Sequence, residues 1–304
     1  MAIAAVLFAA FAAGAVAAPP ATVSRYMTTT DPGTLYGEGC NQANAIPQAR
    51  VILDFGEPWW NGSAYGTIIF GSNTFRSVAQ IETAAEAWLE GFWDCAPPGT
   101  YVRLGVGTSN YRGATGYAHG RAWANMIDRI NSFISSPPSY ASMETARGAS
   151  DIELGWNSPA ASRAWVDGYA SAYSSPSLYW NYGDAAGCPP YGSCSNGWMQ
   201  EDVYYVSWGV PPALPLPQIY CEACYAGDTH GGQSKEWQRL SLYGYTNHAG
   251  RAMYLLGAIT QWAAAGRCCT NTPAQGWSQL WNDLNSDART AQQLESSTDV
   301  TYAN

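Results

Sequence analysis

The sequence predicts an α/β fold, most simply a single TIM-like (β/α)8 barrel that disulfides stabilise. Short apolar segments alternate with longer amphipathic segments between residues 46 and 304, which is typical of repeated βαβ units. Beyond its leading apolar run the chain has about 285 residues, a length that one barrel can occupy. A doubly wound open sheet is the alternative, because alternation alone does not distinguish a closed sheet from an open one.

The first 17 residues have the pattern of a signal peptide. The run MAIAAVLFAAFAAGAVA is too short to span a bilayer, and Ala15-Val16-Ala17 has the small-x-small spacing of a cleavage site. We expect the Pro/Thr/Gly-rich stretch at 18–45 to be an extended lead into the barrel. No later stretch reaches about 18 uninterrupted apolar residues, so we expect no membrane span and a secreted protein.

The predicted elements follow one another from residue 49. The first, ARVILDFGEP, is a strand that ends in carboxylates. A Ser-Pro pair at 158–159 marks the start of one helix, and two prolines at 137–138 stop the helix before it. The segment VPPALPLP replaces a helix and makes the barrel irregular. We expect strands at 49–58, 101–110, 148–156, 177–184, 202–209, 216–220 and 252–260, and helices at 77–94, 117–134, 158–173 and 273–294.

Eight cysteines follow the leading run, an even set that favours disulfides in an exported chain. Cys188 and Cys194 bracket the turn-rich CPPYGSC and could close on each other. The adjacent cysteines at 268–269 would be strained as a pair, so the Cys-x-x-Cys motif at 221–224 is their natural destination. A zinc site built from these last four thiols is the alternative.

Composition limits the classes of partner. Only 12% of the residues are charged and the formal net charge is -9, a balance that repels nucleic acid and offers no basic patch to anionic lipid. The 14 Trp and 20 Tyr residues supply rings that suit the flat apolar faces of sugars as well as a core. We therefore expect a polysaccharide or cell-wall glycan as partner, and a monomer.

Asp151 and Glu153 are the candidate catalytic pair. They lie two residues apart in GASDIELGWNSP, and strand residues at that spacing point the same way, roughly 6.5 to 7 Å apart. Near the carboxyl end of a barrel strand, burial raises the pKa of one acid while the other stays ionised. A glycosidase needs such a pair, with carboxylates about 5 to 5.5 Å or about 6.5 to 9.5 Å apart. We predict Glu153 as general acid and Asp151 or Asp54 as its partner.

Polar and aromatic residues recur at the ends of the other predicted strands, where a barrel would gather them into one cleft. The aromatic members would be stacking platforms for sugar rings, and the polar members would bind hydroxyl groups. The predicted substrate-binding residues are Glu57, Trp59, Trp60, Trp156, Trp180, Tyr182, Asp184, Trp208, Glu222 and Gln261.

Other chemistries lack their motifs, so no cofactor and no metal are expected. His119, His230 and His248 show no paired metal spacing, and the first and last of them are expected to be structural. No Gly-x-Ser-x-Gly elbow of a serine esterase occurs. The glycine-rich GVGTSNYRG has neither the phosphate-loop nor the dinucleotide pattern, which favours an ordinary loop.

One combination of segments carries a family resemblance. GTSNY with YAHGRAW, GASDIELGWNS, LYWNYGDAAGCPPYGSC, EDVYYVSWG, LPLPQIY and ITQW is similar to a set of secreted actinobacterial and related bacterial glycoside-hydrolase-like barrel proteins, over most of the chain. The strand-borne Asp-x-Glu also resembles, more distantly, that of muramidases and chitinases with TIM barrels. That resemblance implies Glu153 as proton donor and Asp151 as its helper. The run of spaced aspartates that precedes the Glu in chitinases is absent, since Gly148, Ala149 and Ser150 stand there.

Two other readings stay open at this point. A noncatalytic secreted protein could bind glycan or wall through the same aromatic residues, with its acids accepting hydrogen bonds from hydroxyls. A structural surface protein would have its acids satisfied internally, by Arg103, Arg121 or Arg147, and their pKa values would then be ordinary.

Overall fold

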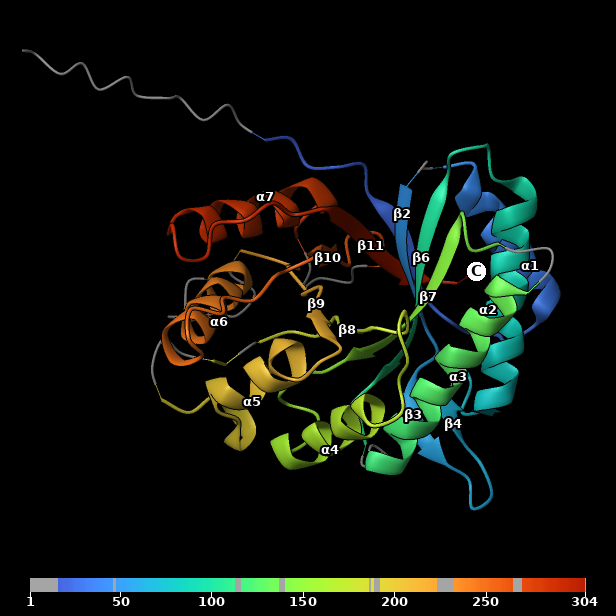
Figure 1. Ribbon diagram of the computed structural model, residues 1–304, viewed down its shortest axis with the longest axis horizontal. Coiled ribbons are helices and arrows are strands. Elements are labelled where there is room, and N and C mark those ends of the chain that lie inside the picture. The colour runs from blue at the N-terminus through green and yellow to red at the C-terminus, as the bar shows by residue number, and fades with distance from the viewer. Residues whose placement is uncertain are drawn as a thin grey trace, which may run out of the picture.

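Eight parallel strands form a nearly closed barrel with helices around it (Figure 1). The computed structural model describes residues 16–45, 48–112, 116–136, 140–185, 187–188, 192–222, 232–264 and 270–303. Neighbouring strands follow the order β10-β11-β1-β2-β6-β7-β8-β9, and every pairing in this sheet is parallel. The predicted α/β barrel is therefore confirmed.

The barrel strands are β1 (Thr22–Tyr26), β2 (Gln48–Asp54), β6 (Tyr101–Ser109), β7 (Glu144–Asp151), β8 (Tyr179–Asn181), β9 (Ala213–Pro215), β10 (Gly257–Thr260) and β11 (Ser296–Tyr302). The helices are α1 (Pro32–Ala43), α2 (Val78–Cys95), α3 (Tyr117–Ser135), α4 (Pro159–Ala170), α5 (Gln200–Tyr204), α6 (Gln233–Asn247) and α7 (Pro273–Asn285). In Figure 1, α1, α2 and α3 flank one side of the strands, while α6 and α7 flank the other.

The chain after β9 closes the barrel. The amide of Leu216 donates to the carbonyl of Asn181 on one side (2.8 Å), and the amide of Ile259 donates to the carbonyl of Pro217 on the other (2.9 Å). A parallel bridge between Gln218 and Ile259 continues this contact. The open-sheet alternative is thus not the fold of this chain.

The interior of the barrel is filled by side chains that alternate along the strands. An inner cluster includes Ile52, Ala149, Trp180 and Tyr182. Glycines on β6 make room for the two rings: a Cβ at Gly105 would lie 2.8 Å from Trp180, and one at Gly107 would lie 2.7 Å from the Tyr182 hydroxyl. The outer layer of helices packs against the opposite faces of the same strands.

Helix starts follow their sequence signals. Ser77 and Gln80 form a capping box at the start of α2. Ser158 caps α4 with Pro159 in its first turn, as predicted. Helix α3 ends at Ser135, and the two prolines expected to stop it lie outside the described residues.

Several predicted elements are wrong. The expected extended lead at 18–45 contains β1 and α1, which complete the barrel. The expected strand at 202–209 is α5 followed by a π-helical turn at Tyr205–Gly209. The segment VPPALPLP carries β9 rather than replacing a helix, and both α6 and β11 were not anticipated.

A small antiparallel sheet follows β2. It consists of β3 (Glu57–Trp60), β4 (Tyr65–Ile68) and β5 (Phe75–Ser77), and none of its strands pairs with the barrel. Figure 1 shows β3 and β4 beyond the strands of the barrel, beside α3. The sheet therefore extends the wall of the barrel at the carboxyl end of β2.

Disulfides are confirmed in the described part of the chain. Cys188 and Cys194 are bonded as predicted, and Cys40 joins Cys95, a pair that links α1 to α2. Cys221 is disulfide-bonded too, which argues against the zinc alternative. The other three cysteines of the proposed zinc site lie outside the described residues, as do residues 1–15 of the expected signal peptide. No helix in the described ranges is both long and apolar enough to cross a membrane.

Candidate active site

A cleft of about 370 Å³ opens at the carboxyl ends of the barrel strands. Asp151 ends β7 and Ser109 ends β6, so the cleft lies where barrel enzymes keep their sites. Its lining combines carboxylates, aromatic rings and an amide. The residues are Tyr26, Glu57, Phe70, Ser109, Tyr111, Asp151, Glu153, Trp156, Tyr220, Gln261 and Tyr302.

The predicted pair, Asp151 and Glu153, meets in this cleft. Strand β7 ends at Asp151, earlier than the expected 156, yet Ile152 and Leu154 are buried while Asp151 and Glu153 both line the cleft. The side chains thus keep alternating between the core and the cleft, as in a strand, for a few residues after the last backbone pairing of β7. The two-residue spacing predicts both carboxylates on the same side of the chain, and both line the cleft in the structure.

An amide links the two acids. Gln218 is buried, and its Nε2 donates to Oδ1 of Asp151 at 2.7 Å. The same side chain also hydrogen-bonds Glu153, an interaction that lowers the pKa of Glu153. Gln218 is not among the predicted site residues, although LPQIY is predicted to be a strand; the structure has a single parallel bridge at Gln218.

Burial dominates the electrostatics of the pair. Burial, followed by the charge of Asp184, raises the pKa of Glu153 to about 8. Burial and the neighbouring carboxylates, with Glu153 first among them, raise the pKa of Asp151 well above its ordinary value. Asp184 is itself 7% exposed. The site therefore holds protons on carboxyl groups that would be ionised in water.

Asp54 lies at the end of β2, below the cleft. It has no exposed surface, and its Oδ1 accepts from the amide of Gly56 at 2.8 Å. Its Oδ2 is buried without a partner in the described structure. Burial raises the pKa of Asp54 to about 7, and the hydrogen bond from the Gly56 amide, followed by the nearby Tyr182 hydroxyl, moderates this rise. Asp54 influences Asp151 electrostatically, but it does not line the cleft.

The loop that carries Glu153 is held by Asn110. Its Oδ1 accepts from the amide of Glu153 at 3.0 Å, and its Nδ2 donates to the carbonyl of Glu153 at 3.0 Å. Asn110 is 2% exposed and also donates to Ser162 on α4. This double contact fixes the backbone of the candidate acid, and no spacing in the sequence indicated it.

Aromatic and amide groups complete the wall of the cleft. Trp156 is 37% exposed and packs edge-on against Tyr111, with ring centroids 5.5 Å apart. Nε2 of Gln261 donates to the Tyr26 hydroxyl at 2.9 Å, and that hydroxyl lies 3.4 Å from the hydroxyl of Tyr220. Trp156, Gln261 and Glu57 are the predicted substrate-binding residues that the cleft contains.

Other predicted binding residues lie elsewhere. Trp180 is 1% exposed and fills the barrel beside Arg50, so no sugar can stack on it. Tyr182 is buried and donates to the carbonyl of Thr108. Trp208 packs in the outer layer, because its segment is helical rather than a strand. The remaining predicted residues outside the cleft lining are Trp59, Trp60 and Glu222, which are exposed, and the buried Asp184.

The described histidines are structural. His119 is buried, accepts from the indole of Trp165 at 2.9 Å and contacts the carbonyl of Gly66 at 2.9 Å, and burial lowers its pKa to about 4. His248 stacks on Tyr204 and contacts Glu201. His230 lies outside the described residues. Within the ranges that the structure describes, no group of three or more His, Cys, Asp or Glu could hold a metal ion.

Arginines do not satisfy the acids. No ion pair of the described chain joins Asp151 or Glu153 to any base. Arg147 instead donates to the carbonyls of Ala146 and Pro176, and Arg103 lies over the ring of Tyr101. The hypothesis of a structural surface protein required that arginines pair with the two acids and that the pKa values of these acids be ordinary. Neither condition is met.

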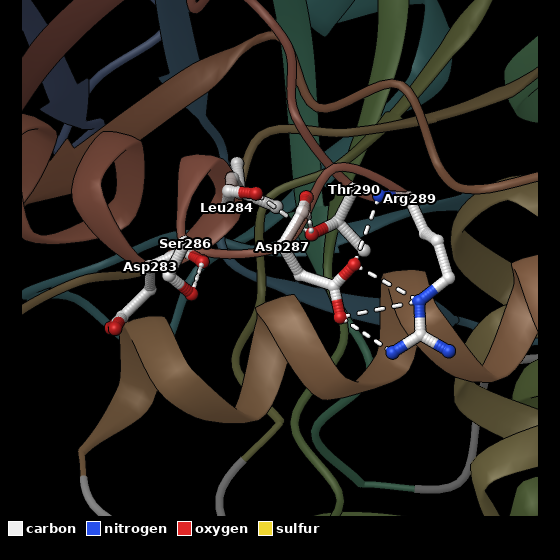
Figure 2. Close-up of polar contacts among 6 residues, drawn as sticks. All are labelled: Asp283, Leu284, Ser286, Asp287, Arg289 and Thr290. Carbon is white, nitrogen blue, oxygen red and sulfur yellow. Dashed lines mark hydrogen bonds and ion pairs between the residues drawn. The ribbon is translucent and has the colours of Figure 1, made fainter. Parts of the chain in front are cut away.

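A second groove, of about 790 Å³, runs along α6 and the turn after α7. It contains an acid that is paired with a base, in contrast to the acids of the cleft. Figure 2 shows Asp287 facing the guanidinium of Arg289, with N–O distances of 2.6 to 3.2 Å. These hydrogen bonds lower the pKa of Asp287 to about 2. The charges of this turn are neutralised within it, unlike those of the cleft.

Comparisons with known proteins add little. No protein-family model matches the chain, and no curated protein is similar to it. Among solved structures it is similar to a GH5-4 broad-specificity endoglucanase from an uncultured bacterium, with 10% identity and a TM-score of 0.37 over 90% of this chain and 77% of that one. It is also similar to an endo-β-mannanase/endo-β-glucanase of Prevotella bryantii, with 9% identity and a TM-score of 0.37 over 90% of this chain and 40% of that one. Likenesses this distant carry no argument, so the function is argued from the site alone.

Proposed function

We propose that the protein is a secreted glycoside hydrolase, or a hydrolase-like protein, that acts on a cell-wall or environmental polysaccharide. One observation carries the proposal: Glu153 and Asp151 line one cleft at the carboxyl end of a barrel, with raised pKa values and no base paired to them. General acid catalysis at neutral pH needs a carboxyl group that keeps its proton there.

The two acids divide the roles between them. Glu153, whose pKa is about 8, gives its proton to the glycosidic oxygen as that bond breaks. The mechanism needs Asp151 ionised, so that it stabilises the developing oxocarbenium ion. Burial opposes this by raising the pKa of Asp151, and the hydrogen bond that Gln218 donates to its carboxylate offsets part of that effect. Water then adds its hydroxyl to the anomeric carbon, and its remaining proton returns to the carboxylates. Asp151 supports this role better than Asp54, because Asp54 does not line the cleft.

Aromatic side chains bind the sugar in this proposal. Trp156 presents part of its ring to the cleft, and the neighbouring Tyr111 fixes its orientation. Sugar rings bury their apolar face against such a surface, and the Gln261 amide offers a polar contact to a hydroxyl group.

The test is release of reducing ends from a panel of insoluble glycans, including peptidoglycan and chitin. The wild type should hydrolyse at least one of them, and Glu153→Gln should lose at least about a thousandfold in kcat with little change in glycan binding. Glu82→Gln on α2 is the matched control and should keep full activity, because Glu82 pairs with Arg129 and does not line the cleft. A folded Glu153→Gln variant as active as the wild type would refute the role of this acid.

A noncatalytic glycan-binding protein is the second candidate. It is favoured by the burial of the acids that would partner Glu153, since Asp151 is 3% exposed and Asp54 has no exposed surface. In that case Glu153→Gln should weaken glycan pull-down, and the wild type should show no turnover across the panel. Loss of turnover with retained binding excludes this candidate.

A further inference from the structure

We propose that the cleft admits only glycans without acidic groups, so that its ligands are neutral or ammonium-bearing sugar chains. The inference rests on the proposed function and specifies its substrate class. It excludes polysaccharides whose repeating units carry carboxylate, sulfate or phosphate groups at the sugar bound beside Glu153.

Every charge that the described lining can carry is negative. Three of the described lining residues, Glu57, Asp151 and Glu153, are acids, and none is Lys, Arg or His. Asp184 adds a carboxyl group that raises the pKa of both members of the catalytic pair. The ion pairs of the described chain bring one base near, Arg112, whose Nε lies 3.9 Å from Glu57. Its side chain is 65% exposed, so solvent screens it.

The acids of the cleft already oppose one another's ionisation. Their pKa values are raised because each added negative charge meets burial and other carboxyl groups. A ligand carboxylate placed among them would meet the same resistance, or would have to take up a proton. Since water is partly excluded there, the penalty is larger than it would be on an open surface.

The rest of the lining suits uncharged sugar. Ser109 and Gln261 offer a hydroxyl and an amide, and six rings supply apolar surface and phenol groups. These groups bind hydroxyls and ring faces without needing charge on the ligand. The six rings are those of Tyr26, Phe70, Tyr111, Trp156, Tyr220 and Tyr302.

The experiment measures binding by calorimetry in a Glu153→Gln background, so that hydrolysis does not consume the probes. The probes are cellohexaose and N-acetylated chitohexaose, the C6-oxidised carboxylate form of each, and the fully deacetylated chitohexaose. We expect each oxidised probe to bind at least roughly tenfold more weakly than its neutral parent at low salt. Raising the salt concentration tenfold should shrink this difference and leave the neutral probes unchanged.

A second variant separates charge from shape. Adding Glu57→Gln should reduce the penalty for the oxidised probes by roughly threefold, because one lining charge is gone, whereas adding Glu82→Gln on α2 should not. An oxidised probe that binds as tightly as its parent would overturn the charge inference alone. Failure of every probe, neutral and charged, would contradict the proposed function together with this inference.

Discussion

The two ends of the barrel interior carry ionisable side chains of opposite sign, and at the amino end one of them, Arg50, has a carboxylate partner. At the amino end, Arg50 is 6% exposed and donates to Glu295 at 3.0 Å and to Ser296 at 2.7 Å. At the carboxyl end, Asp151 and Glu153 have an amide between them and no paired base. Charges with partners hold a fold together, whereas uncompensated buried charges lower its stability and persist where chemistry needs them.

Register explains how the arginines gather. Arg50 and Arg103 are direct neighbours on β2 and β6, and Arg147 lies on the next strand, opposite Gly105. Each arginine comes two residues before an interior position of its own strand. Because side chains two apart on a strand lie on the same face, all three point inward. Arg50 lies 5.5 Å from the centroid of the Trp180 ring, which joins the amino end to the packed centre.

The largest loss of stability is expected from the amino end. Arg50→Met should lower the free energy of unfolding by about 2 to 3 kcal/mol, because a buried charge-assisted network is lost while half-exposed Glu295 remains solvated. Urea unfolding measures this loss. Arg129→Met, which removes an exposed partner of Glu82, should cost less than about 1 kcal/mol. Equal losses in the two variants would remove the contrast between paired interior and surface charges.

The carboxyl end should respond in the opposite direction. Asp54 has a pKa of about 7 in the fold against 3.8 ordinarily, so the unfolded chain loses this proton first as the pH rises. Stability therefore falls between these two pH values, and Asp54→Asn should remove that loss, gaining up to about 4 kcal/mol at pH 8 and less at pH 5. Urea unfolding at both pH values measures the gain.

Asp287 supplies a control of opposite sign for Asp54. Its pKa is lowered to about 2, so its hydrogen bonds stabilise the fold above pH 3.8 and fail only in strong acid. Asp287→Asn should therefore lower stability by the same amount at pH 5 and pH 8. A stabilising Asp287→Asn, or a destabilising Asp54→Asn at pH 8, would contradict the assignment of the two acids.

A smaller effect sharpens the role of Gln218. Gln218→Met removes the hydrogen bonds that favour negative charge on the acid pair, so the midpoints of the pH–activity profile should move upward by about 1. Gln261→Met removes the other cleft amide, which donates to the Tyr26 hydroxyl. It should weaken glycan binding without moving the midpoints. If both variants shift the profile equally, Gln218 has no specific effect on the pair.

Much of the fold could be predicted because the spacing of apolar residues along the sequence shows which face of a helix or strand is buried. Helices α2 and α3 and strand β6 were placed within a few residues, since each has a clear apolar spacing. The segment DVYYVSWG was misread because β-branched and aromatic residues favour strands, whereas packing of Val203 and Val206 on the core decides for helix. Strand β11, SSTDVTY, lacks an apolar pattern because its buried polar groups find partners, as Thr298 does with Ser24.

The site was predictable only where it lies on one segment. The spacing of Asp151 and Glu153 was enough to place both in the cleft. Gln218 and Asn110 act from other segments of the chain, and no local pattern marks a side chain whose partner is 67 or 43 residues away. Trp180 was misplaced because its inward orientation depends on the space that Gly105 of β6 leaves for its ring, a contact between distant segments that no local pattern reveals.

The central claim is that the barrel keeps a protonated acid at its carboxyl end near neutral pH. Carbon-13 NMR of the side-chain carboxyl of Glu153, assigned by its absence in Glu153→Gln, measures this directly and needs no substrate. The account predicts a titration midpoint near 8 in the wild type. A midpoint near the ordinary 4.5 would contradict it, because Glu153 would then be ionised when the reaction needs its proton.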